Sequence, residues 1–460
     1  MIPSASEATL GVEFSASRLH FHREGPGRLA RTFRRFVKDA ARLVSYTLRT
    51  MVKAIKWAFC LALPVLAVLS SVLAQSQADT PAAAQARAEI PAVEALLKRV
   101  PDRAAVLYYL AGDYLLLGES QKALALLKEC VAANEGFDPD RDPVFRPLYS
   151  DARFRSLVMQ AEKQYPVVDR AQVAFSVPEK DLIPEGLAFD EKAQVFYLSS
   201  LFHKKIVWFG MDGKVSDFVP EGKYDLLPIC GLRDEIADNS LWAAGCEDDG
   251  RGELYHFSAD GSRLEHISPP TPGKHLFNDL VLRGNSEIYL TDSLANQVYR
   301  IERKGHKFTT LSFPRPLFYP NGITLSDDQK LLYVADAFGV FVFDLEQNTS
   351  HEVDRGPSGT LSGIDGLYWY KGDLVGVQNG IGVPRITQFS LAPGGLRVQQ
   401  EKTLVYRSPQ LGTTTTGAIR NSDFFFIENS QIDNREGNRI LDPAKLEPVR
   451  IGKIALSPVP

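Results

Sequence analysis

Tyr-Pro-Asn-Gly-Ile-Thr-Leu-Ser-Asp-Asp-Gln-Lys-Leu-Leu-Tyr-Val-Ala-Asp, residues 319–336, is the stretch that decides the fold. After Tyr-Pro, a polar residue and a glycine lead into a short apolar run, which turns at Asp-Asp-Gln-Lys and returns as a second apolar run. Short apolar runs separated by turn residues are typical of paired β-strands. The stretch therefore predicts a hairpin whose first strand starts beside Asn321.

The same pattern, a polar residue followed by Gly or Asp and then by an apolar run, occurs six times. The six pairs are Glu185-Gly186, Cys230-Gly231, Asn278-Asp279, Asn321-Gly322, Asp365-Gly366 and Thr416-Gly417. Their second positions are separated by 45, 48, 43, 44 and 51 residues. A period in the forties with several strands in each unit is typical of a β-propeller. The sequence thus predicts a mainly β, six-bladed propeller over residues 171–458, closed by pairing of residues 172–177 with 449–456.

The region before the propeller has a different pattern. Residues 75–87, rich in Ala, Gln and Ser, are expected to be a linker, and residues 88–165 carry apolar positions at helical spacing. This helical region resembles a tetratricopeptide repeat, whose packing positions match Leu110, Ala111, Tyr114, Gly118, Ala123 and Leu127. Because one repeat cannot bury its own apolar face, we expect it to pack on neighbouring helices or on the propeller.

The N-terminal residues predict export. Residues 51–74 combine a short basic region, an apolar run and a small-residue cleavage site, the pattern of a secretory signal peptide, and Met51 is then the expected natural start. Residues 1–50 would be a non-native or basic extension. A periplasmic or secreted location follows, with membrane attachment only through an uncleaved leader. The net charge of -4, with acidic and basic residues interspersed, argues against a nucleic-acid partner.

A metal site is predicted where the inner strands of the six blades begin. The first strand of a blade lies innermost, so the residues that precede the repeated Gly or Asp converge on the propeller axis. Glu185, Asn278, Asn321 and Asp365 would supply carboxylate and amide oxygens, a donor set that suits calcium or magnesium. The alternative is that Asn and Asp only favour turns at such positions, which would not explain the glutamate.

These residues lie in motifs that resemble those of a known family. Pro-Glu-Gly-Leu-Ala-Phe-Asp (184–190), Phe-Asn-Asp-Leu-Val-Leu (277–282), the stretch quoted first and Gly-Ile-Asp-Gly-Leu (363–367) are similar to the regucalcin and gluconolactonase (senescence marker protein) family. Paraoxonases and strictosidine-synthase-like proteins are its relatives. The resemblance implies Glu185, Asn321 and Asp365 as direct metal ligands, with Asn278 as a fourth contact or a substrate-orienting group.

The expected function is an exported, metal-dependent hydrolase of lactones or esters. One divalent cation, calcium in the first instance with Mg²⁺, Mn²⁺ or Zn²⁺ as alternatives, would polarise the carbonyl, and no organic cofactor is expected. Asp365 is the expected base that takes a proton from water, with Glu185 as its substitute. The alternatives are a non-catalytic ligand-binding or interaction scaffold, which recruits a protein partner through its helices, and a non-hydrolytic enzyme of the strictosidine-synthase type.

Two further predictions concern the surroundings of the metal. Loops after the second strands, together with a histidine near Asn278, are expected to shape the substrate pocket, and their candidate residues are His203, Asp248, His275, Asp292, Asp336, Asn379 and Asn429. For the histidine His203 the alternative is an exposed loop position. Cys230 and Cys246 would face each other across a hairpin centred near Asp238, within reach of a disulfide, unless both remain free thiols.

Overall fold

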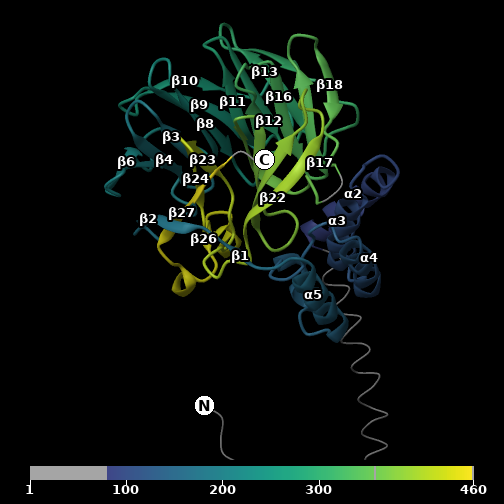
Figure 1. The fold of residues 1–460 in the computed structure, drawn as a ribbon. Helices are drawn as coiled ribbons and strands as arrows, with labels where there is room; N and C mark the ends of the chain where they lie inside the picture. Colours follow the sequence, from purple (N-terminus) through teal and green to yellow (C-terminus); the bar gives the residue numbers. More distant parts are fainter. Residues whose placement is uncertain (1–79, 357–358, 458–460) are drawn as a thin grey trace, which may run out of the picture. The chain divides into compact units, whose positions relative to one another are not determined.

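The computed structural model of the protein describes residues 80–356 and 359–457, and it contains a group of helices followed by a large β domain (Figure 1). The predicted signal peptide and the extension before it lie outside the described residues. The helices are α2 (Pro81–Leu96), α3 (Arg103–Leu116), α4 (Ser120–Ala132) and α5 (Ala152–Gln164), with a 3₁₀ turn at Pro143–Leu148. None of the helices within the described ranges has the length and apolar character needed to cross a membrane.

The propeller of the β domain consists of six sheets, five of four strands and one of five, and most of them are built from consecutive strands (Figure 1). Blade 1 contains β3 (Leu187–Asp190), β4 (Val195–Ser199), β5 (Ile206–Gly210) and β6 (Val215–Val219). Blade 2 contains β7 (Ile229–Glu235), β8 (Ser240–Cys246), β9 (Gly252–Phe257) and β10 (Arg263–Ile267). Blade 3 contains β11 (Phe277–Arg283), β12 (Glu287–Asp292), β13 (Gln297–Glu302) and β14 (Lys307–Thr310).

The second half of the ring repeats this plan. Blade 4 contains β15 (Ile323–Leu325), β16 (Leu331–Asp336), β17 (Gly339–Asp344) and β18 (Thr349–Glu352). Blade 5 contains β19 (Ile364–Tyr370), β20 (Asp373–Gln378), β21 (Arg385–Leu391) and β22 (Val398–Tyr406), to which the short β1 (Val168–Asp169) adds. Blade 6 contains β23 (Gly417–Arg420), β24 (Asp423–Ile427), β27 (Val449–Ala455) and β2 (Gln172–Val177). A small two-stranded ribbon, β25 (Arg435–Glu436) and β26 (Arg439–Ile440), lies between β24 and β27 in the chain.

The innermost strands form a closed ring. Each of β3, β7, β11, β15, β19 and β23 contacts the first strand of the next blade, and β23 returns to β3. The six-bladed propeller predicted from the repeat is thereby confirmed, and the repeated polar pairs lie at the starts of these inner strands. The predicted closure is also present, because β2 pairs with β27, from Gln172 opposite Lys453 to Val177 opposite Val449.

The repeated glycines are explained by how closely the inner strands approach one another. A Cβ at Gly186 would collide with the backbone oxygen of Cys230 in blade 2, and one at Gly322 with the backbone oxygen of Asp365 in blade 5. Any larger residue at these two positions would push neighbouring blades apart. The glycines therefore set the tight radius that brings the preceding polar residues together.

The helices begin earlier than the sequence predicted. Pro81, at the first position of α2, lies inside the segment expected to be a linker, and the side chain of Thr80 caps the helix by accepting from the Ala83 backbone nitrogen. Proline at the first turn and alanine beyond it both favour a helix. The Ala-rich composition of residues 75–87 therefore indicates a helix from Pro81 onward, where a linker was expected. The α3–α4 pair turns at Gly118, whose φ is +80°. Its likeness to a tetratricopeptide repeat stays a prediction.

The helical segment, residues 81–164, shares one hydrophobic core with the propeller. Phe338 of blade 4 and Ile381 of blade 5 are buried in the same cluster as the apolar residues of α2 to α5. Tyr109 of α3 packs edge-on against Phe318 and Phe338, with ring centroids 5.2 and 5.7 Å apart. The expectation that the helices lean on the propeller thus corresponds to the contacts observed.

Polar contacts around Asp138 reinforce this docking. The backbone of Asp138 bonds to that of Ile381 and Val383, and its carboxylate accepts from Tyr406 at 2.5 Å and from Arg407 at 2.8 Å. The Asp138 carboxylate is fully buried. A buried charge is tolerated only where donors of this kind surround it, so the connection between α4 and α5 is held firmly on blade 5.

Gly382 offers a direct test of this docking. It has a φ of +95°, and a Cβ there would meet the backbone oxygen of Asp138. We expect Gly382→Ala to lower the free energy of unfolding and to make the helical segment more sensitive to limited proteolysis. Gly394→Ala is the matched control, because Gly394 has a φ of +92° with nothing within 4 Å of the added Cβ. The loss for Gly382→Ala should exceed that of the control by at least about 1 kcal/mol; equal losses would show that the contact does not matter.

A second test concerns Asp113, which is buried within α3 and whose Oδ2 has no hydrogen-bond partner. Burial raises the pKa of Asp113 to about 7, and nearby Glu89 adds to the rise. Since this pKa exceeds the value of about 4 for an unfolded chain, the folded state binds the extra proton between those values. The stability contribution of Asp113 therefore falls as the pH rises from about 4 to 7.

We expect Asp113→Asn to change the free energy of unfolding little at about pH 4 and to increase it at pH 8, on the order of 1–3 kcal/mol. Urea unfolding at the two pH values measures the difference. Glu119→Gln, which removes an exposed carboxylate from the turn before α4, is the control and should show no such pH dependence. An equal effect of Asp113→Asn at both pH values would contradict the assignment.

Candidate functional site

The channel mouth brings together two of the predicted carboxylates. Glu185 precedes β3 and Asp365 lies in β19, and the Asp365 carboxylate raises the pKa of Glu185. Asn379, from the loop after β20, donates its amide to Asp365 Oδ2 at 2.5 Å and to the backbone oxygen of Thr414 at 3.0 Å. The Asp365 carboxylate is therefore oriented by a neighbouring side chain that is itself fixed.

The electrostatics of this pair favour the neutral forms of its carboxyl groups. Burial raises the pKa of Glu185, and the Asp365 carboxylate raises it further, while Arg435 acts in the opposite direction. Burial also raises the pKa of Asp365, against the amides of Asn379 and Asn321. Two like charges in one buried place repel each other, so a cation between them would relieve both burial and repulsion.

The residues present fit a hard divalent cation. Asn321 Oδ1 and Asp365 Oδ1 are both buried without a hydrogen-bond partner. Asn278 donates its amide nitrogen to Ser293 Oγ at 3.0 Å, an arrangement that leaves its carbonyl oxygen for a ligand. Buried oxygens without donors are costly unless something binds them, and carboxylate and amide oxygens are the donors that calcium and magnesium prefer.

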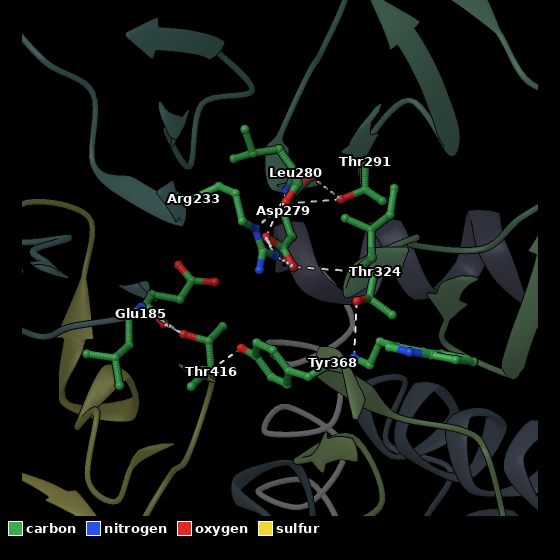
Figure 2. A network of polar contacts seen from close by, with 12 residues as sticks. Glu185, Arg233, Asp279, Leu280, Thr291, Thr324, Tyr368 and Thr416 are labelled. Atoms are coloured by element: carbon green, nitrogen blue, oxygen red, sulfur yellow. Dashed lines mark hydrogen bonds and ion pairs between the residues drawn. The ribbon is translucent and has the colours of Figure 1, made fainter. Parts of the chain in front are cut away.

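The backbone of Glu185 is held in place by two blades. Its carbonyl oxygen accepts from the hydroxyls of Thr415, at 3.1 Å, and Thr416, both from blade 6. On the other side, the amide of Gly186 donates to Ser199 Oγ of blade 1 at 2.7 Å. The backbone nitrogen of Gly417, the next residue, donates to the Tyr368 hydroxyl at 2.6 Å, and Figure 2 shows Glu185, Thr416 and Tyr368 in this network. The carboxylate thus projects from a backbone that cannot shift freely.

Asp279, the residue after Asn278 on the inner strand of blade 3, forms a second polar group that sequence reasoning missed. Asp279 occupies the repeat position that is glycine in the other five blades. Its carboxylate pairs with Arg233 at 3.2 Å and accepts from the backbone nitrogen of Leu280 at 2.8 Å (Figure 2). The sequence signal that could have identified this polar group was the absence of glycine from the third repeat. Because Arg233 neutralises it, Asp279 is satisfied within the protein.

Cys230 and Cys246 form a disulfide beside Glu185. It joins β7 to β8 with 6.1 Å between the Cα atoms, and its sulfur atoms and a Glu185 carboxylate oxygen lie within 4.8 Å of one another. The strand register shifts through a bulge between Ile229 and Leu232. Of the two alternatives for these cysteines, the structure contains the bonded one, while Cys130 is a buried free thiol.

A cavity of about 310 Å³ extends from Asp365 to the helical segment. Its polar lining residues are Asn321, Asp365, Asn379 and Ser362. Its other walls are apolar and come from both parts of the molecule: Ala105, Tyr108, Tyr109, Phe137, Tyr319, Ala337, Phe338 and Ile364. The helices therefore contribute to the candidate site, a role that the sequence did not predict for them.

Most of the loop residues predicted to line the pocket do not line this cavity. Asp292 Oδ1 accepts from the backbone nitrogen of Leu276 at 2.9 Å, and Asp336 Oδ2 from that of Phe318 at 3.0 Å. Asn429 Oδ1 likewise accepts from the backbone nitrogen of Arg450 at 2.6 Å. Side chains at these strand ends fasten neighbouring backbone, because buried N–H groups there need acceptors. Asn379 is the member of this set that faces the cavity.

The remaining candidates also have partners elsewhere. His275 forms a hydrogen bond through Nδ1 with Asp292, at 2.6 Å. It therefore belongs to the group of contacts by which Asp292 holds the backbone of blade 3. His203 gathers with Glu179, Asp181 and Glu221 near the surface of blade 1. Asp248 pairs with Arg435 at 3.2 Å and acts electrostatically on Glu185 without lining the cavity. Neither of the two candidate histidines lines the cavity that contains Asp365.

Tyr319 is a further lining residue that the sequence did not single out. It precedes Pro320 and has a φ of +53°, a conformation that is costly for a bulky side chain. Its backbone is held there by Asn296, which accepts from the Tyr319 nitrogen at 2.7 Å. Tyr319 is 43% exposed, but desolvation of its hydroxyl and the neighbouring Glu185 and Asp365 raise the pKa of that group. Strained backbone of this kind often occurs at binding sites, but it cannot be read from residue types.

Comparison with known proteins gives similarity of fold only. The sequence matches no family model and no curated protein. Solved structures similar to this chain include a gluconolactonase from Xanthomonas campestris (16% identity, 64% of this chain and 98% of that chain, TM-score 0.45). Another is a virginiamycin B lyase from Staphylococcus aureus (18% identity, 63% of this chain and 99% of that chain, TM-score 0.44). A third is a PQQ-bound aldose sugar dehydrogenase from Streptomyces coelicolor (13% identity, 63% of this chain and 98% of that chain, TM-score 0.45). Their functions differ, and similarity at this level assigns none of them to this chain.

The disulfide predicts a thiol count. The full chain contains four cysteines, two of which are Cys230 and Cys246. Reduction of the unfolded full chain should therefore add two titratable thiols, those of Cys230 and Cys246, to the count obtained without reductant. Cys230→Ser should also lower the free energy of unfolding by roughly 2–4 kcal/mol, because the bond closes a loop of 16 residues. A count of four thiols before reduction would contradict the bond.

Proposed function

We propose that the protein is an exported hydrolase of lactones or esters that depends on one divalent cation, calcium in the first instance. The observation that carries the proposal is the pair of buried, unpartnered oxygens of Asn321 and Asp365 at one end of a cavity. Glu185 and Asn278 complete the ligand set that we propose. Export is supported by the Cys230–Cys246 disulfide, since such bonds persist in oxidising compartments.

When bound, calcium would act as a Lewis acid toward the carbonyl oxygen of the substrate. Asp365 is the proposed base. Asn379 orients the carboxylate through Oδ2; Oδ1 would contact the cation, and Oδ2, which keeps a second lone pair, would take the proton from the attacking water. As the oxygen of that water bonds to the carbonyl carbon, the carbon–oxygen bond of the ester breaks, and the leaving alkoxide takes a proton back from Asp365. The apolar walls keep other water from the reaction.

Asn321 and Asn379 orient the reacting groups in this proposal. Both amides line the cavity next to Asp365, and both favour the charged form of its carboxylate. Glu185 comes from blade 1 and is fixed through its backbone. It serves as a ligand, and its pKa, raised by burial and by Asp365, makes it the substitute base.

The test is a panel of simple lactones, sugar lactones, homoserine lactones and aryl esters, assayed with calcium and with chelator. We expect chelator to abolish turnover, and Asp365→Asn to lower kcat by about 10²-fold or more, the range typical of a lost general base. Calcium affinity, measured by calorimetry, should fall at least tenfold in the same variant.

Asp327→Asn is the matched control. It removes an exposed carboxylate from the turn after β15, at the far end of the inner strand that follows Asn321, and should leave turnover and calcium affinity unchanged. Turnover that persists in chelator would contradict metal dependence. Tight calcium binding without turnover of any substrate would instead favour the non-catalytic scaffold.

A further inference from the structure

Helix α3 forms one wall of the cavity that contains Asp365. Ala105, Tyr108 and Tyr109 lie on consecutive turns of this helix and line the cavity, and Phe137 extends the wall from the connection after α4. On the propeller side, Phe338 is almost fully buried and packs against Tyr109. The helical segment is therefore built into the site.

The two tyrosines offer the cavity their rings, because their hydroxyls are used within the helical segment. Tyr108 donates to Asp142 Oδ2 at 2.6 Å. Tyr109 donates to Glu89 Oε2, on α2, at 2.9 Å. A phenol that already donates to a carboxylate has no proton left to donate to a ligand. The wall thus behaves as an apolar surface although tyrosines form it.

The wall is also rigid. Tyr108 packs against Phe137 and Phe145, with ring centroids 5.4 and 5.3 Å apart, while Phe318 and Phe338 hold Tyr109 on the other side. Side chains packed in this way cannot swing aside without loss of close contacts. The shape of the apolar end is therefore preformed.

Asn321 and Asn379 are the polar side chains beside Asp365, whereas Ser362 Oγ donates to Asp102 Oδ2, at the start of α3, at 3.0 Å. Asn321, Asp365, Asn379 and Ser362 provide its hydrogen-bonding side chains, and Asp365 is the one charged residue among the described residues that line it. At about 310 Å³, the volume is at the lower end of the roughly 300–1,000 Å³ that is typical of small-molecule sites. Such a cavity fits one small molecule with a polar group at one end and an apolar group at the other.

We infer that α3 and Phe338 form a subsite for the apolar substituent of the substrate, which is then an alkyl- or aryl-substituted lactone or ester. A polyhydroxylated sugar lactone would leave its hydroxyls without partners against these rings, at a cost in affinity. The identity of the reacting group rests on the proposed function. The apolar subsite itself rests on the wall and can be tested without turnover.

The experiment compares three five-membered lactones that differ in their substituents: γ-nonalactone, γ-butyrolactone and ribono-1,4-lactone. Calorimetry on Asp365→Asn, in the presence of calcium, measures binding without hydrolysis. We expect γ-nonalactone to bind at least tenfold more tightly than either of the other two. Equal affinities of the three lactones, or tighter binding of ribonolactone, would overturn the inference.

Substitutions in the wall, introduced into Asp365→Asn, then locate the subsite. Ala105→Phe fills the apolar end and should reduce the preference for γ-nonalactone to less than threefold, with little change for γ-butyrolactone. Tyr109→Phe keeps the ring and should preserve the preference. Arg103→Phe is the matched control, because it places the same ring at an exposed position of α3. An unchanged preference in Ala105→Phe would overturn the inference.

If Ala105→Phe does not fold, as judged by its circular dichroism spectrum, Tyr109→Gln replaces it, with the same expected loss of preference and the same contradicting outcome. The two proposals fail in different ways. Absence of turnover in the wild type, with the γ-nonalactone preference intact, would overturn the hydrolase and leave the subsite. Turnover by the wild type without any preference would overturn the subsite and leave the hydrolase.

Discussion

Two carboxylates, Glu185 and Asp365, are buried at the same end of the propeller channel, and the rest of the candidate site depends on this arrangement. Burial and mutual repulsion both work against their charged forms. Within the protein, the charged forms are stabilised mainly by the amides of Asn379 and Asn321 and by one arginine, Arg435. The contrast with Asp279 is informative, because Arg233 pairs with that carboxylate directly. Asp279 is neutralised by a directly paired arginine, whereas Glu185 and Asp365 form no such pair with any described residue. We propose that these two carboxylates bind a metal ion.

The glycines of the inner ring make this concentration of charge feasible. With Gly186 and Gly322 in place, neighbouring inner strands approach so closely that side chains from opposite blades share one channel mouth. The backbone of Glu185 is then held by hydroxyls from blade 6 and by Ser199 from its own blade. Positions fixed in this way lose little entropy when a ligand binds, which is the advantage of a preformed site.

The helical segment changes what the propeller alone would offer. An open channel mouth would expose Asp365 and Asn379 to water, whereas Tyr109 and Phe338 enclose them on one side. The segment can do this because it shares a core with blades 4 and 5 and is fastened there through Asp138. Enclosure strengthens electrostatic interactions within the cavity, and it gives the helices a function at the site in addition to their packing.

The sequence by itself determined the number of blades, the closure of the ring and the convergence of Glu185, Asn321 and Asp365, because a repeat period places residues of equal phase at equivalent points of a ring. The sequence wrongly predicted that Asp292, Asp336 and Asn429 line the pocket. Each of them accepts a hydrogen bond from neighbouring backbone, and the residue type at a strand end does not reveal which backbone it will contact. The early start of α2 was missed for a similar reason, because an Ala-rich segment suits a linker and a helix alike. Only the tertiary structure decided the pairing of Asp279 with Arg233, the strained backbone of Tyr319 and the aromatic wall from α3. Each of these depends on contacts between segments that are far apart in the chain, and such contacts follow from the packing of whole elements, which no local pattern specifies.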